Sequence, residues 1–91
     1  MGKLSIFFTD RASEELAYWM QRDANVCKKI GVLLVDIQRY GNIGKGKPEA
    51  LKYNLQGWWS RRITDEHRLV YRIDEEDGTI FVLQCRGHYN D

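Results

Sequence analysis

The chain has 91 residues with a formal net charge of +1 at neutral pH, and 43% of its residues are hydrophobic and 30% are charged. This length suits one small domain spanning residues 1–91, and the composition can bury a core, which excludes a disordered chain. No apolar run approaches the roughly 20 residues that cross a membrane, and no secretory signal is recognisable. Two cysteines are too few for a disulfide scaffold. We therefore expect a cytoplasmic protein without membrane association.

Residues 1–40 carry one strand pattern and then two helical patterns. Residues 4–8 are rich in β-branched and aromatic side chains, which predicts a strand. Thr9 or Asp10 can cap a first helix, whose apolar side chains at helical spacing are Ala12, Leu16, Trp19 and Met20. Asp23 can cap a second helix, so we expect a helical hairpin with a tight turn near residues 22–25. The second helix has an apolar stripe of Val26, Ile30, Leu33, Leu34 and Ile37 and an opposite, polar side of Lys28, Lys29, Asp36 and Arg39.

Residues 41–91 change from a glycine-rich loop to strands. Gly41 is a typical helix end, and the glycines and the proline between residues 41 and 48 exclude regular structure. Three strands are predicted over residues 58–63, 67–73 and 79–85, with a tight turn at Asp77 and Gly78. The fold class is therefore α+β: a strand, a two-helix hairpin and then a three-stranded antiparallel meander, with the helices on one face of a mainly antiparallel sheet.

The basic residues gather in the middle of the sequence. Residues 39–72 hold eight basic and three acidic side chains, whereas residues 73–91 hold Arg86 against five acidic side chains. A nearly neutral protein with this distribution can present one positive surface, for which phosphate is the obvious partner. The alternative is a set of solvated charges on separate faces.

The first segment with side chains suited to phosphate chemistry is the loop of residues 45–52. Lys45, Lys47 and Lys52 can neutralise phosphate, the glycines let the backbone approach a ligand, and Glu49 is a carboxylate among these cations. The spacing of a Walker phosphate loop is absent. On its own the loop is a weak signal, because a glutamate among lysines is most often part of a surface ion pair.

The second segment is the predicted strand pair of residues 58–73. Side chains alternate along a strand, so Arg61 shares a face with Ile63 and Arg62 lies on the other face. Arg68 lies near the start of the next strand, on the face opposite His67. A guanidinium held on a strand can bind phosphate and stabilise developing charge, or its stem can simply cover an apolar sheet.

The third segment is the C-terminus, where His88 and Tyr89 follow the last strand. A histidine titrates near neutral pH and a tyrosine can stack on a base, although at a chain end such residues are commonly only a tail. Together the three segments supply what RNA cleavage by the ribose 2′-OH requires. A carboxylate takes the proton, cations stabilise the phosphorane, an imidazole protonates the leaving 5′-oxygen, and no metal is needed.

At this point the sequence resembles a known family, the YoeB/Txe toxins of the RelE-like group, which are mRNA-cleaving members of bacterial type II toxin–antitoxin pairs. The residues that carry the resemblance run collinearly through the C-terminal half of the chain. They are residues 44–49, Leu51, Lys52, Asn54, Leu55, Gly57, residues 59–64, residues 66–71, Cys85, Arg86, His88 and Tyr89. The helical half matches in pattern more than in letters, including Tyr18, Trp19 and residues 28–30.

The resemblance implies a microbial-ribonuclease-like fold and metal-independent, ribosome-dependent cleavage of mRNA in the A site, which inhibits translation. By position, Glu49 is implied as the general base, Arg68 as the residue that stabilises the transition state, and His88 as the general acid. The resemblance further implies that Lys52 and Arg62 support phosphate binding and that Tyr89 helps to place the base.

The resemblance also implies partners. These are the ribosome, its mRNA and a cognate antitoxin of the YefM/Axe type with an acidic C-terminal segment, and the family suggests a homodimer. No cofactor or metal is implied. The alternatives are a non-catalytic ribosome- or RNA-binding module of the same fold and a purely structural interaction domain.

A few positions depart from the family pattern. The chain continues past the terminal tyrosine with Asn90 and Asp91, and the added carboxylate would weaken RNA binding. Tyr53 stands where a histidine is common in the family. His67, which faces away from Arg68, is interpreted as a structural residue that is hydrogen-bonded in the sheet, and the two cysteines as small core residues.

Overall fold

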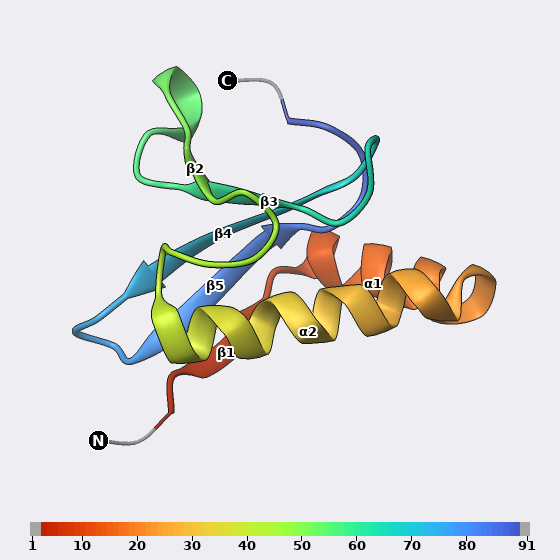
Figure 1. Ribbon diagram of the computed structural model, residues 1–91, viewed down its shortest axis with the longest axis horizontal. Coiled ribbons are helices and arrows are strands. Elements are labelled where there is room, and N and C mark those ends of the chain that lie inside the picture. Colours follow the sequence, from red (N-terminus) through yellow and green to blue (C-terminus); the bar gives the residue numbers. More distant parts are fainter. Residues whose placement is uncertain (1–2, 90–91) are drawn as a thin grey trace.

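The computed structural model describes residues 3–89, in which two α-helices cover one face of a five-stranded sheet (Figure 1). In chain order the elements are β1 (Ser5–Phe8), α1 (Asp10–Arg22), α2 (Ala24–Tyr40), β2 (Glu49–Ala50), the 3₁₀ turn η1 (Tyr53–Leu55), β3 (Trp59–Arg62), β4 (Arg68–Asp74) and β5 (Thr79–Gln84). The strand order is β1-β5-β4-β3-β2. Strand β1 pairs with β5 in parallel and every other pair is antiparallel. The predicted α+β class is confirmed, and the short strand β2 extends the predicted meander.

The helix boundaries follow from the predicted capping residues. The hydroxyl of Thr9 accepts a hydrogen bond of 3.1 Å from the backbone N–H of Ala12, and Asp23 caps α2 in the same way. Helix α2 ends at Gly41, which has a φ of +70° that glycine adopts without strain. Within residues 3–89, neither helix offers a stretch that is both long enough and apolar enough to cross a bilayer.

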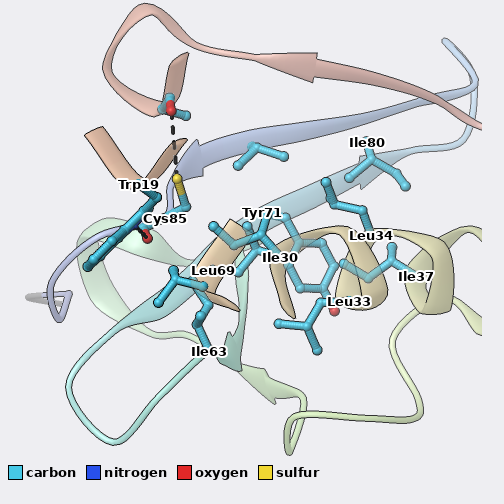
Figure 2. Close-up of a cluster of buried hydrophobic side chains, with 13 residues drawn as sticks. Trp19, Ile30, Leu33, Leu34, Ile37, Ile63, Leu69, Tyr71, Ile80 and Cys85 are labelled. Atoms are coloured by element: carbon cyan, nitrogen blue, oxygen red, sulfur yellow. Dashed lines mark hydrogen bonds between the residues drawn. The ribbon is translucent and has the colours of Figure 1, made fainter. Parts of the chain in front are cut away.

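The core lies between the helices and the sheet (Figure 2). The whole predicted apolar stripe of α2 is buried, and it packs against sheet residues that include Leu69, Tyr71 and Ile80. Cys85 is fully buried and Cys27 packs against the cluster, as predicted. Met20 differs from the expected apolar stripe of α1, because 69% of it is exposed. It lies two residues before the end of α1, and its neighbour Trp19 is the side chain of this turn that is buried.

One residue of the predicted polar side of α2 is buried. Asp36 was expected to face solvent, but only 6% of it is exposed, and its carboxylate pairs with the fully buried Arg61 at 2.5 Å. Position 36 follows Leu33 by one three-residue helical step, so it belongs to the edge of the buried stripe. The predicted apolar stripe leaves out Asp36 only because it is charged. Its partner Arg61 belongs to a strand remote in sequence, so the local pattern could not indicate the pair.

Candidate active site

An open pocket of about 400 Å³ lies where four chain segments converge. The segments are the end of the glycine-rich loop with β2, strand β3, the start of β4 and the C-terminal segment. The lining residues are Lys47, Pro48, Glu49, Ser60, Arg62, Arg68, His88 and Tyr89. Six of the eight residues predicted for the site therefore border one pocket, namely Lys47, Glu49, Arg62, Arg68, His88 and Tyr89.

The sheet register brings the charged groups of this pocket together. Glu49 of β2 lies opposite Ser60 of β3, and Arg62 of β3 lies opposite Arg68 of β4. Like charges directly opposite one another on adjacent strands are destabilising. The sheet therefore holds two guanidinium groups where an anion would relieve their repulsion.

Arg68 is held firmly although it is a pocket residue. Only 9% of it is exposed, and its Nη1 donates to the backbone carbonyl oxygens of Thr64, Asp65 and His67 at 2.8, 3.1 and 3.3 Å. These carbonyls belong to the turn between β3 and β4. The guanidinium is thus fixed against its own turn, which suits electrostatic stabilisation.

Glu49, Tyr89 and His88 form a chain of contacts across the pocket. The hydroxyl of Tyr89 donates a hydrogen bond of 2.9 Å to Oε1 of Glu49. The rings of His88 and Tyr89 lie 4.8 Å apart with 30° between their planes. The tyrosine therefore links the carboxylate to the imidazole, which come from positions far apart in the sequence.

The C-terminal segment is anchored by backbone contacts just before His88. The N–H of Gly87 donates to Nδ1 of His67 at 2.8 Å, and the carbonyl of Gly87 accepts from the N–H of Arg68 at 3.0 Å. The other side of the His67 ring packs edge-on against Trp19 in the core, with ring centres 4.7 Å apart. His67 thus has the hydrogen-bonded structural place predicted for it, and it fixes the segment that carries His88. Asn90 and Asp91, to which the predicted weakening of RNA binding was assigned, lie outside the described residues.

The fully buried Arg61 organises the loop that leads to the pocket. Its Nη1 and Nη2 donate to the carbonyl oxygens of Gly41, Ile43 and Lys45 at 2.6 to 3.1 Å. The remaining donors bind Asp36 and the hydroxyl of Tyr71, so all five N–H groups of the guanidinium have an acceptor. The hydrogen bond from Arg61 is the main reason that the pKa of Asp36 is lowered, and a backbone bond from Lys45 contributes.

Sequence analysis missed Arg61 and Asp36 as determinants of the site. The signal was present, because strand alternation put Arg61 on the same face as Ile63. A charge on a buried face requires a buried partner of opposite charge. This requirement indicates Asp36, which is the one acidic residue of the second helix.

The glycines of the loop have a packing role. A Cβ atom on Gly46 would lie 2.9 Å from Cδ2 of Leu33 and 3.1 Å from the carbonyl oxygen of Arg62, and one on Gly44 would collide with the Asp36 carboxylate. The closest neighbours of these glycines are thus atoms of the protein itself. Gly44 and Gly46 thus let the loop pack closely on the core, and the role of the glycines in the approach of a ligand stays a prediction.

Two of the predicted phosphate-binding lysines lie outside the pocket lining. The backbone N–H of Lys45 donates to Asp36, and Lys45 borders a different groove, which also includes Val32, Val35 and Arg39 on α2. Lys52 is exposed and immediately precedes η1, which is the green turn at the top of Figure 1. Their predicted roles in binding RNA stay predictions.

Comparison with known proteins assigns the family. Residues 8–89 match the family described as YoeB-like toxin of bacterial type II toxin-antitoxin system. The chain belongs to this family. Toxin YoeB of Escherichia coli strain K12 is 43% identical over 86 residues, which are 94% of this chain and 100% of that protein. The family resemblance read from the sequence is thereby confirmed.

Solved structures of YoeB proteins share the fold. The YoeB dimer from Staphylococcus aureus is 47% identical, with a TM-score of 0.89 over 97% of this chain and 100% of that chain. The heterotetrameric YoeB-YefM toxin-antitoxin complex from Staphylococcus aureus matches at 47% identity, with a TM-score of 0.86 and the same coverage. The chain is therefore a YoeB-like toxin in both sequence and fold.

Proposed function

We propose that this toxin is an endoribonuclease that cleaves mRNA in the ribosomal A site and so inhibits translation, with residues 1–91 acting as one toxin domain in the bacterial cytoplasm. The observation that carries the proposal is the pocket in which Glu49, Arg68 and His88 meet. A base, a fixed cation and an acid around one cavity are the groups that metal-independent phosphodiester cleavage requires.

The proposed reaction uses each of these groups once. The carboxylate of Glu49 takes the proton from the ribose 2′-OH, and the 2′-oxygen attacks the phosphorus. The bond from phosphorus to the 5′-oxygen breaks while His88 donates a proton to that oxygen. The products are a 2′,3′-cyclic phosphate and a 5′-hydroxyl, and the cyclic phosphate can then open to a 3′-phosphate.

The cations of the pocket have a separate task. The guanidinium of Arg68 is fixed by carbonyl oxygens on one side, which supports its assignment to the charge that develops on the phosphorane. Arg62 opposite it and Lys47 at the rim supply further positive charge. The hydroxyl of Tyr89 donates a hydrogen bond to Glu49, and we expect a bound nucleotide to replace this contact while Tyr89 stacks on a base.

We propose the same classes of partner for this chain as for its relatives. The Staphylococcus aureus structures include a YoeB dimer and a YoeB-YefM complex, which supports a homodimer and a YefM-like antitoxin here. An acidic C-terminal segment of the antitoxin would match the arginines and the lysine that border the pocket. Ribosome dependence rests on membership of the family.

The decisive test is substitution of the base and the acid, followed by mapping of mRNA ends. Glu49→Ala and His88→Gln should each lower cleavage of mRNA on ribosomes by about 10²- to 10⁴-fold, which is the usual contribution of a general base or acid. Binding to ribosomes should persist, because the cations remain. Glu75→Ala, in the acidic turn after β4, is the matched control and should cleave as the wild type does.

Two results would contradict this proposal. Cleavage that survives both substitutions would remove Glu49 and His88 from the mechanism. Wild-type protein that binds ribosomes without producing new mRNA ends would favour the non-catalytic binding module.

A further inference from the structure

Two arginines outside the pocket share one aromatic ring. The guanidinium carbon of Arg86 lies 3.7 Å from the centre of the Tyr18 ring, and that of Arg22 lies 4.2 Å from the same centre. The two positive charges are therefore no more than about 8 Å apart, a distance at which like charges repel. Neither guanidinium has a carboxylate partner among residues 3–89.

The position of Arg86 is fixed by the residues on either side of it. The N–H of Cys85 donates to Oε1 of Glu15 at 2.8 Å, and the carbonyl of Cys85 accepts from Nε1 of Trp19 at 2.9 Å. On the other side, the N–H of Gly87 donates to Nδ1 of His67. An exposed arginine between two anchored residues loses little freedom when it binds a ligand, which favours binding.

The same anchored segment connects this arginine pair to the pocket. Arg86 and His88 are two residues apart, so their Cα atoms are separated by at most about 7 Å. One side of the segment presents Arg86 towards α1, and the other presents His88 to the site of cleavage. An RNA strand that leaves the pocket along the C-terminal segment therefore meets Arg86 and Arg22 next.

We propose that Arg22, Tyr18 and Arg86 form a phosphate clamp for the RNA backbone next to the pocket. The inference rests on the proposed cleavage of RNA and extends it to a second contact. Arginine binds phosphate through two parallel hydrogen bonds, and Tyr18 keeps both guanidinium groups in place. A phosphate at the clamp relieves the repulsion between the two charges. The contact is with the backbone, so it strengthens binding of every RNA sequence alike.

The clamp is tested with a single-stranded RNA oligonucleotide whose 2′-O-methyl groups prevent cleavage. The double variant R22Q/R86Q should bind it more weakly. The slope of log affinity against log salt concentration should become shallower by about 0.7 for each phosphate contact that is lost. Both side chains are exposed, so the thermal midpoint of the variant should stay near that of the wild type. Tyr18→Phe should keep wild-type binding, whereas Tyr18→Leu should weaken it because the ring that orients the arginines is gone.

The matched control removes the same charge elsewhere. The double variant K3Q/R39Q changes two exposed cations near the C-terminal end of α2, where Nε2 of Gln38 donates to the carbonyl of Leu4. Arg39 lies about 22 Å along α2 from the start of that helix beside Arg22. The control variant should keep the wild-type salt slope. A wild-type salt slope in R22Q/R86Q, or an equal loss of slope in K3Q/R39Q, would overturn the clamp. So would a variant that binds RNA normally but no longer binds a glutamate-rich peptide, because the surface would then serve an acidic protein.

The failure of the clamp can be told apart from the failure of the proposed function. If wild-type protein does not cleave mRNA on ribosomes, the proposed function is wrong, while the slopes with the uncleavable oligonucleotide still decide the clamp. If the wild type cleaves and R22Q/R86Q needs no more protein for half-maximal cleavage, the clamp is wrong and the function stands.

Discussion

At the scale of single residues, two neighbouring arginines on β3 differ in burial and in role. Arg61 is fully buried and Arg62 is exposed at the pocket, because successive side chains of a strand point to opposite faces. Arg61 satisfies all five of its N–H donors inside the protein. Arg62 directs its charge to the site instead. One element thus supplies both a buried structural cation and an exposed cation at the pocket.

Substitution of the two arginines should therefore separate stability from activity. Arg61→Met should lower the free energy of unfolding by about 3 to 5 kcal/mol, because it leaves a buried carboxylate without its partner. Arg62→Met should change it by no more than about 0.5 kcal/mol, as is usual for an exposed side chain, but should reduce cleavage. Urea unfolding of both variants measures the difference. Equal stability of the two would show that the buried network adds nothing to the fold.

At the scale of elements, the loop of residues 41–48 decides where Glu49 lies. It has little regular structure, and it is positioned by Arg61 from within and by a hydrogen bond of 2.7 Å from the N–H of Arg62 to the carbonyl of Gly46. Strand β2 follows directly and carries Glu49. The loop can pack this closely because its glycines have no side chain.

Gly46→Ala should be more harmful than a substitution of glycine where space is open. Both Gly46 and Gly57 have positive φ angles, of +79° and +95°, but only the Cβ atom at position 46 would meet core atoms. Gly46→Ala should therefore destabilise the protein by about 1 to 3 kcal/mol more than Gly57→Ala does, which is the usual cost of overpacking. Denaturant unfolding of the two variants is the measurement. A smaller cost at position 46 would mean that the loop can move away from Leu33.

At the scale of the whole molecule, opposite charges lie at opposite ends of the sheet. The acidic residues 74–77 lie at the end of β4 and in the turn after it, whereas Arg68 begins β4. Seven residues of strand place these groups roughly 20 Å apart. A protein of net charge +1 can therefore present a positive end to an anionic partner while its acidic end lies away from that partner.

The stability of the whole fold should also depend on pH through the buried ion pair. The pKa of Asp36 is lowered from the ordinary 3.8, so its ionised form stabilises the folded state above that pH. This stabilisation is lost as the pH falls through the lower, folded-state pKa. The difference in unfolding free energy between wild type and Asp36→Asn should thus be full near neutral pH and shrink below about pH 4. A constant gap between the two proteins at all pH values would contradict the assignment to Asp36.

Much of the fold could be read from local patterns. The helix caps at Thr9 and Asp23, the apolar stripe of α2 and the turn at Gly78 all depend on neighbours in sequence, and all appear as predicted. Strand β2 was missed because two residues form a strand only when β3 lies beside them. Asp36 was misplaced because its partner, Arg61, is 25 residues away.

The sequence by itself determined the class of fold, the family and the kinds of side chain available for chemistry, since these depend on spacing and residue type. Only the tertiary structure decided which of the basic residues border the pocket. The lining of the pocket includes Lys47, Arg62 and Arg68 but not Lys45, which borders the groove along α2. The physical reason is that these side chains meet in one pocket only through contacts between segments that are distant in sequence. Local periodicity encodes which face a residue occupies, and long-range packing sets which faces meet.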